Sequence, residues 1–497
     1  MNNFLKALKN ETNFGYTENM AITHRTTKSD LLDMFALGGS MRNRSENDII
    51  LMFRKAYEEN PTYALRCLFY LRDVRGGGQG ERRFFRICMK DLAKNNTEAA
   101  KRNLQHIPTF GRWDDLYVFV DTPLENDAFA FIKKQLALDI LCKIPSLLAK
   151  WLKSENTSSK ESRRLGGKTR VALGLNHKGY RKMLSTLRER INIVERLMSE
   201  GKWDKIQYDK IPSKAGLIYK NAFAKHDYDR YKAFSESKTT KVNAATLNPV
   251  DIAGQIFQYG NWYGKSASDI ERAMWQKYWN NLKDYYNGRE ERGIAVVDVS
   301  GSMSGTPMNA AVSMGAYIAE RGKGPFANHF ITFSSHPELV KFDGIDIYDK
   351  FQRARNANWG GSTNIEATFD LLLKTALDNN CTQEEIPETV YVFSDMEFNH
   401  CVSKNKSRYS WGGSITLDEA ETLFDTMRKK WNSYGYKMPR LIFWNLDARQ
   451  NNIPAIGDSI SYVSGFSMAA LEGVLSGKDG IDMMMEILNK ERYSIIK

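Results

Sequence analysis

Three oxygen-bearing side chains, Asp298, Ser300 and Ser302, follow a short apolar segment in the second half of the chain. The segment, Gly293–Val297, is typical of a buried strand that ends where these residues begin. Carboxylate and hydroxyl oxygens are hard ligands, and no thiol or imidazole accompanies them. The spacing therefore favours a divalent ion such as Mg²⁺, with Mn²⁺ or Ca²⁺ as substitutes. Because Asp and Ser are also common in turns, the site needs further ligands from elsewhere.

Two later segments offer such ligands. Trp359–Glu366 is a glycine turn that precedes an amphipathic helix, and Val390–Glu397 is an apolar strand that ends in an acid. In an open α/β sheet, ligands gather outside the carboxyl ends of the strands. We therefore predict one metal site that is formed by Asp298, Ser300, Ser302, Thr363 and Asp395.

This ligand pattern resembles the metal-ion-dependent adhesion site of von Willebrand factor A domains, and the resemblance covers roughly residues 290–497. Further apolar segments at 329–333, 440–446 and 460–466 fit the strands of that fold. The resemblance implies a doubly wound, Rossmann-like α/β domain. It also implies a metal ion with an open coordination position that a carboxylate from a protein partner completes. The alternative is an ordinary α/β domain whose strand ends carry Asp and Ser by chance.

The composition limits the class of protein. A chain of 497 residues is expected to form two or three domains. It has no apolar run of 18 residues and no apolar signal segment at its start, so we expect no membrane association. Its five cysteines are odd in number and widely spaced, which is typical of free thiols in a reducing, cytoplasmic compartment.

Charge is distributed unevenly along the chain. Residues 151–250 hold 22 basic and 10 acidic side chains, a net +12 that equals the net charge of the entire protein. Residues 1–288 are predicted to be mainly helical, because apolar residues recur at three- and four-residue spacing. We expect helices at 46–59, 61–71, 81–94, 128–152, 178–200 and 269–286, and a polar, mobile basic loop at 154–170. A basic helical domain (1–288) joined to an acidic metal-binding domain (289–497) indicates a polyanionic partner for the first.

A glycine-rich segment, Gly76-Gly77-Gly78-Gln79-Gly80, joins two predicted helices and is flanked by Arg72, Arg75, Arg82 and Arg83. Consecutive glycines let backbone N–H groups converge on an anion, and the following helix adds its dipole. The segment predicts a phosphate contact. The alternative is a tight connection between helices in which arginine and acidic side chains pair.

The segment Gly111-Arg112-Trp113-Asp114-Asp115-Leu116 resembles the helical repeats of Ro/TROVE ribonucleoproteins, which join a helical ring to a von Willebrand factor A domain. A closer likeness is to the related bacterial, plant and phage family of undefined function. Its phrases include Arg72–Gly77, Lys150–Leu152, Ile211–Ser213 and Val392–Met396. The resemblance implies a HEAT-like solenoid or ring that binds small structured or single-stranded RNA. A complete ring is in doubt because the helical region is short for the family.

RNA binding of this kind needs basic side chains for the phosphates. Trp113 and Trp151 are more typical of core residues than of platforms for bases. The predicted RNA contacts are Arg72, Arg75, Arg82, Arg83, Arg112, Arg163, Arg164, Lys168, Arg170, Lys178, Arg181 and Lys182.

We therefore expect a non-enzymatic RNA-binding protein whose metal site captures a protein partner. The alternative is a protein-interaction or virion-associated module without a nucleic-acid ligand. A metal-dependent nuclease is disfavoured, because two carboxylates are few for such a site. Ser300 and Ser302 are not placed as hydrolase nucleophiles either, because no G-x-S-x-G elbow surrounds them. The insertion at 401–415 is a candidate lid beside Asp395.

Overall fold

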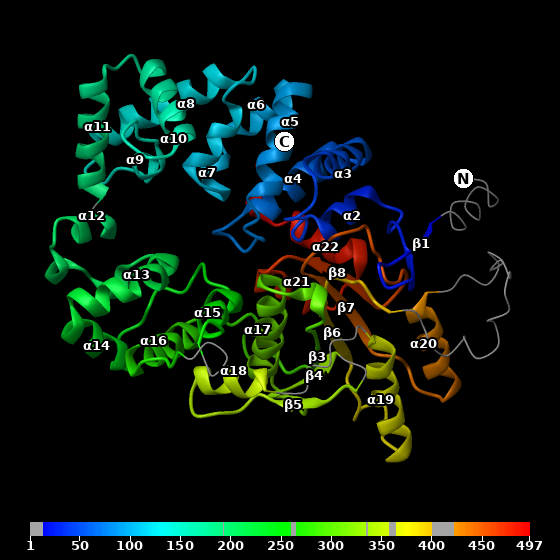
Figure 1. The fold of residues 1–497 in the computed structure, drawn as a ribbon. Helices are drawn as coiled ribbons and strands as arrows, with labels where there is room; N and C mark the ends of the chain where they lie inside the picture. The colour runs from blue at the N-terminus through cyan, green and yellow to red at the C-terminus, as the bar shows by residue number, and fades with distance from the viewer. Residues whose placement is uncertain (1–12, 192, 260–264, 334–335, 357–363, 400–421) are drawn as a thin grey trace. The chain divides into compact units, whose positions relative to one another are not determined.

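The computed structural model describes residues 13–191, 193–259, 265–333, 336–356, 364–399 and 422–497. The chain forms two compact units. The sheet unit contains residues 1–64 and 247–489, and the helical unit contains residues 65–246 and 490–497. The protein thus combines a helical region with an α/β region (Figure 1). The domain boundary between residues 288 and 289 stays a prediction. It lies within the sheet unit, which contains the segments on both sides of it.

The sheet unit is built on a mixed six-stranded sheet with the order β5-β4-β3-β6-β7-β8. Strand β5 is antiparallel to β4, and every other neighbouring pair is parallel. The central strands are near-continuous apolar runs because helices cover both faces of such a sheet. The strands are β3 (Gly293–Asp298), β4 (His329–Phe333), β5 (Leu339–Lys341), β6 (Thr389–Ser394), β7 (Arg440–Asn445) and β8 (Ile460–Ser464).

Helices connect these strands in both directions from β3. The chain moves from β3 to β4 through α17 (Thr306–Arg321), and from β6 to β7, on the other side of β3, through α20 (Leu423–Ser433). Right-handed crossovers in opposite directions place their helices on opposite faces of the sheet, as Figure 1 shows for α17 and α20. The remaining helices here are α18 (Ile347–Arg355), α19 (Ile365–Asp378), α21 (Leu471–Val474) and α22 (Gly480–Leu488).

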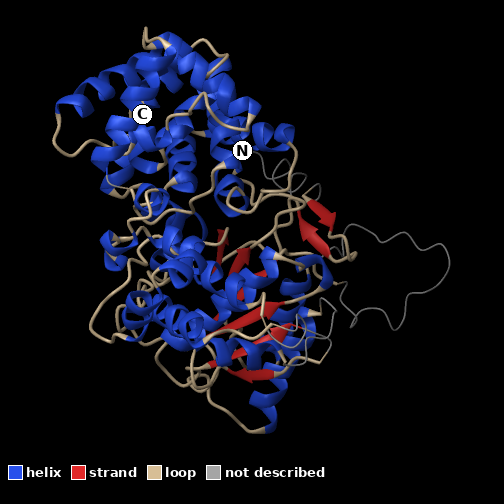
Figure 2. Ribbon diagram, turned by 60° about the vertical axis from the view of Figure 1, so that its left-hand side comes forward, coloured by secondary structure: helices blue, strands red, loops and turns tan. Residues whose placement is uncertain are grey.

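The first part of the chain completes this unit. Residues 446–459, between β7 and β8, contain no helix. Helix α2 (Asp30–Leu37) packs beside β8 instead, with Ser464 Oγ donating to the Phe35 carbonyl at 3.1 Å. The hairpin of β1 (Phe14–Tyr16) and β2 (Ile22–His24) is the second, smaller sheet in Figure 2. The other helices of the unit that precede β3 are α3 (Glu46–Glu59), α15 (Pro249–Ile256) and α16 (Asp269–Asn280).

The described residues of the helical unit contain helices and no strand. Helix α4 (Pro61–Arg72) leads into it. The chain then forms α5 (Arg83–Asn95), α6 (Thr97–Leu104), α7 (Ile107–Phe110), α8 (Glu125–Leu141), α9 (Leu148–Trp151), α10 (Lys160–Ala172), α11 (His177–Ile191), α12 (Val194–Ser199), α13 (Ser213–His226), α14 (Tyr228–Glu236) and, at the end, α23 (Glu491–Ser494).

Most predicted helices are present, and some differ in extent. The predicted helix at 128–152 is interrupted after Leu141, because Pro145 disfavours helical geometry at the residue before it. The helix predicted at 269–286 ends at Asn280. The predicted mobile loop at 154–170 is wrong in its second half, where α10 begins at Lys160. Its cap is Ser159, which accepts a hydrogen bond from the Ser162 N–H at 3.2 Å. Among the described residues, no helix is long and apolar enough to cross a membrane.

Candidate metal site and basic helical surface

The two acidic residues of the predicted metal site lie on neighbouring strands. Asp298 ends β3, Asp395 directly follows β6, and the two strands pair in parallel. The connections from β3 and from β6 run in opposite directions, so the carboxyl ends of these strands form the switch point of the sheet. Ligand sites in open α/β sheets form at such a point.

Hydrogen bonds fix the side chains around Asp298. Its Oδ1 accepts from the Ser300 N–H at 2.9 Å, and its Oδ2 accepts from Ser394 Oγ at 2.5 Å. The Ser300 and Ser302 hydroxyl oxygens lie 3.0 Å apart. The residues of the Asp-x-Ser-x-Ser turn therefore lie together.

Asp395 carries the atom that fits a metal ion best. Its Oδ1 accepts from the Glu397 N–H at 3.1 Å, whereas its Oδ2 is buried and has no hydrogen-bond partner among the described residues. A buried carboxylate oxygen without a partner is costly unless a ligand binds it. Two carboxylates and two hydroxyls form a hard-oxygen set that suits Mg²⁺.

Burial dominates the electrostatics of this pair. Asp298 is 0% and Asp395 is 1% exposed. Burial, together with the nearby charge of Asp395, raises the pKa of Asp298 to about 7, and burial also raises the pKa of Asp395. Without a counter-charge, two buried carboxylates resist joint ionisation, and a divalent cation supplies that charge.

The fifth predicted ligand, Thr363, lies outside the described residues, as does the candidate lid at 401–415. Within the described ranges, no three His, Cys, Asp or Glu side chains cluster as metal ligands. A metal held here would thus depend on hydroxyl oxygens in addition to the two carboxylates.

Sequence reasoning missed two charged residues beside the site. The buried Glu397 carboxylate accepts from the Glu18 N–H at 2.7 Å and from Asn452 Nδ2 at 2.8 Å, and burial raises its pKa to about 7. Arg449, from the segment after β7, donates to the Ser302 carbonyl. Glu397 could have been noticed because it lies two residues beyond Asp395. Arg449 stands in no motif.

The glycine-rich segment binds an anion of the chain itself. The Asp73 Oδ1 accepts from the N–H groups of Arg75 at 3.0 Å and Gly76 at 2.8 Å, and Arg492 pairs with the same carboxylate. Asp73 is fully buried, and Tyr493 donates to its Oδ2 at 3.2 Å. These N–H groups are therefore already bound to Asp73. The structure favours the alternative, a tight connection between helices, over the predicted phosphate contact.

Arg72 is a structural residue. It is 1% exposed and pairs with the buried Asp115, with Nη2 2.7 Å from Oδ2. Its prediction as an RNA contact is wrong, because no phosphate can reach the buried guanidinium. Arg83 is half-buried, and its Nη1 has no hydrogen-bond partner. Arg112 lies 4.3 Å above the Trp151 ring and 3.4 Å from Asp114.

The cations of helix α10 are largely neutralised by neighbouring groups. Arg164 pairs with Asp121 and Glu161, and Lys168 pairs with Asp121 and Glu125. In the same region Arg170 pairs with Glu155, and Arg163 donates to the carbonyls of Thr157 and Ser158.

Helix α11 is different. Lys178, Arg181 and Lys182 are exposed, and none has an ion pair within the described part of the chain. Their three- and four-residue spacing places them on one side of the helix. Arg75 and Arg82 are likewise exposed. Among the described residues, these five predicted RNA contacts are exposed and have neither an ion pair nor a side-chain hydrogen bond, whereas the exposed Arg163 donates to two carbonyls.

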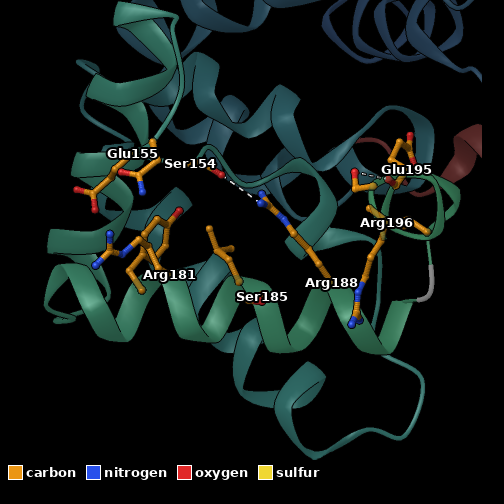
Figure 3. A pocket seen from close by; sticks show the side chains of 12 residues that line it. Ser154, Glu155, Arg181, Ser185, Arg188, Glu195 and Arg196 are labelled. Atoms are coloured by element: carbon orange, nitrogen blue, oxygen red, sulfur yellow. Dashed lines mark hydrogen bonds between the residues drawn. The ribbon is translucent and has the colours of Figure 1, made fainter. Parts of the chain in front are cut away.

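A pocket of about 460 Å³ lies beside α11. Figure 3 shows Arg181, Ser185 and Arg188 projecting from the helix toward the segment that carries Ser154 and Glu155. Arg188 is held in place by bonds to the Ala149 and Leu152 carbonyls, both at 2.8 Å. The pocket therefore has fixed and free cations on the same helix.

Comparison with known proteins places the chain among families without a defined activity. Residues 17–139 and 135–287 match the family described as Domain of unknown function (DUF2828), and residues 292–494 match Domain of unknown function (DUF7788). The chain is also similar to "Uncharacterized protein L728" of Acanthamoeba polyphaga mimivirus. The two are 29% identical over 529 residues, which cover 97% of this chain and 88% of the relative.

Proposed function

The chain belongs to the family described as Domain of unknown function (DUF2828), and on that premise we propose that it is a non-enzymatic binding protein with a divalent-metal adhesion site. The observation that carries this proposal is the buried, unpartnered Oδ2 of Asp395 beside the buried Asp298. The strand order, with one antiparallel edge strand, supports a von Willebrand factor A fold for residues 289–497.

The side chains of this site would have different roles in binding the ion. When bound, Mg²⁺ (or Mn²⁺ or Ca²⁺) supplies positive charge and an open coordination position. Asp298 and Asp395 would neutralise that charge, and Ser300 and Ser302 would offer hydroxyl oxygens. Thr363 is proposed as a further ligand on the resemblance alone. A carboxylate from a protein partner would complete the set, and no residue here is proposed as a nucleophile.

Thermal unfolding in Mg²⁺ tests the metal site. Asp298→Ala should abolish the rise in Tm that Mg²⁺ produces, because the ion loses a buried carboxylate ligand. The matched control is Asp284→Ala, which removes an acid of the same unit that precedes β3. A Tm rise that persists in Asp298→Ala and matches that of the control would refute the metal site.

We further propose that the helical unit binds RNA, as a HEAT-like, TROVE-type platform for structured or single-stranded RNA in the cytoplasm. The exposed Lys178, Arg181 and Lys182 on one side of α11 support this function. Free cations on a surface release counterions from the RNA when they meet its phosphates. The pocket beside Arg181 is a place where an unpaired nucleotide could stack and hydrogen-bond.

A comparison of two charge-removal variants tests RNA binding. Replacing Lys178, Arg181 and Lys182 with Gln should weaken binding of a labelled RNA hairpin with a single-stranded tail. It should also reduce the salt slope by up to about 0.7–0.9 per lost phosphate contact. The control replaces Arg164, Lys168 and Arg170, which removes the same charge from positions that are already paired with acids. Equal loss in both variants, or loss in neither, would contradict the assignment to α11.

A second candidate is a protein-interaction module without nucleic acid, for which a virion-associated role is one setting. The internal pairing of Arg164, Lys168 and Arg170 favours it, since these three cations are already balanced by neighbouring acids. Purification at low salt without nuclease separates the two. An RNase-sensitive species that dissociates at high salt supports RNA binding. A nucleic-acid-free protein that ignores added RNA supports the interaction module.

A further inference from the structure

One arginine links the metal-site turn to the first residues of the sheet unit. The Arg449 guanidinium donates to the Ser302 carbonyl and lies 3.3 Å from Asp447 Oδ2. Its Nη1 lies 3.6 Å from the Glu18 carboxylate. A single positive group therefore contacts the Asp-x-Ser-x-Ser turn, a buried acid and an acid from the N-terminal segment.

The backbone around Glu18 is fixed, whereas its carboxylate is not. The Glu18 N–H donates to Glu397, Thr17 Oγ1 donates to the Phe398 carbonyl at 2.7 Å, and Asn19 Nδ2 donates to the Glu397 carbonyl at 2.6 Å. These bonds hold the segment across the loop that follows β6. The Glu18 side chain itself is 44% exposed, and its only ion pair among the described residues exceeds hydrogen-bond length. Exposed pairs of this kind contribute little to stability.

The two acids on Arg449 thus differ in how easily they are displaced. Asp447 is 5% exposed and also accepts from Asn43 Nδ2 at 3.1 Å, which holds it in the structure. Glu18 faces solvent at the edge of the metal-site turn. An incoming carboxylate can therefore replace Glu18 on Arg449 more easily than it can replace Asp447.

We propose that Arg449 is a second contact for the acidic side chain that completes the metal site, and that Glu18 is its internal competitor. This inference rests on the proposed function. One oxygen of the incoming carboxylate would face the ion, and the other would accept from the guanidinium. Charge-assisted bonds of that kind are strong and directional. The site would therefore select an aspartate or glutamate side chain of a protein partner over a neutral oxygen ligand.

Acetate is a minimal probe for such a side chain, and its affinity for the Mg²⁺-loaded full-length protein can be measured by NMR titration. Glu18→Gln should bind acetate about two- to fivefold more tightly, because the competing charge is gone. Arg449→Gln should bind it at least about tenfold more weakly, because a charge-assisted bond is lost. Arg449→Lys keeps the charge, so its acetate affinity should lie between those of the wild type and Arg449→Gln. An intermediate affinity would separate loss of recognition from misfolding.

Matched controls lie at the ends of β3 and β6 that are opposite the metal site. Arg292 and Glu388 form an exposed pair at 3.4 Å, at the amino ends of β3 and β6. Arg292→Gln and Glu388→Gln should leave acetate binding unchanged. Acetate affinity that is equal in the wild type and all five variants, or no acetate binding to a protein that binds Mg²⁺, would overturn the inference. Failure of Mg²⁺ to bind the wild-type protein would instead overturn the proposed metal site.

Discussion

Protonation of a half-buried carboxyl group is coupled to folding at Glu291, just before β3. Its Oε2 accepts from Tyr391 Oη at 2.6 Å, and burial raises the pKa of the Glu291 carboxyl above its ordinary value. The folded protein therefore holds this proton more tightly than the unfolded chain does. The resulting stabilisation is complete below the ordinary pKa and is lost as the pH rises through the raised value.

Glu291→Gln removes this titration. We expect the Tm of the variant, relative to that of the wild type, to increase from pH 4 to pH 8, because the wild type loses the stabilisation from the protonated Glu291 over that range. Glu290→Gln is the control, because Glu290 is the exposed neighbour. Thermal unfolding at a series of pH values measures both. Parallel pH profiles for the two variants would show that burial of Glu291 has no such effect.

Individual residues also show how far the sequence predicts the site. Asp298, Ser300, Ser302 and Asp395 were identifiable because each follows an apolar strand, and strand ends converge at the switch point. Arg449 was not, because only the loop after β7 brings it to Ser302. The same limit explains why the sequence did not reveal that Arg72 is buried. It stands four residues before a glycine-rich segment, and its partner Asp115 lies 43 positions away.

At the scale of elements, the close approach of α17 to β3 positions the metal-site turn. Gly315 faces the sheet, and a Cβ there would lie 2.4 Å from Val297 Cγ2. A helix can approach a strand this closely only where the side chain is absent. The strands and most helices were predictable from the periodicity of apolar residues. The close packing of α17 on β3 was not, because a glycine within a helical pattern does not indicate which residue it packs against. Helix α10 was missed for a related reason, since Gly166 and Gly167 made its segment resemble a loop.

Gly315→Ala should therefore destabilise the sheet unit by about 1–3 kcal/mol, because the added methyl group overpacks against Val297. It should also weaken Mg²⁺ binding, since Asp298 is the next residue along the strand. Gly254→Ala in α15 is the control. A Cβ there meets only Asn309, at 3.9 Å, so alanine should be neutral or slightly stabilising. Chemical denaturation measures both variants, and equal stabilities would contradict the close packing.

At the scale of the whole molecule, the candidate sites belong to different compact units. The metal-site residues lie in the sheet unit, and the exposed cations of α11 lie in the helical unit. The sequence anticipated two functional regions from their opposite charge and different periodicity. It could not anticipate that the chain begins in the sheet unit and ends in the helical unit. Such long-range pairing depends on contacts like those of Asn103 with Lys497, which no local pattern encodes.

Two sites in separate units should respond independently to substitution. Asp298→Ala should abolish the Mg²⁺-dependent Tm shift while RNA affinity changes by less than about twofold, since substitutions at sites that share no partners are usually additive. The triple replacement of Lys178, Arg181 and Lys182 should do the reverse. Combining all four changes should give the sum of the separate free-energy changes. If RNA affinity instead depends on Mg²⁺ in the wild type and loses that dependence in Asp298→Ala, the two sites act as one. Occupation of the metal site would then regulate RNA binding.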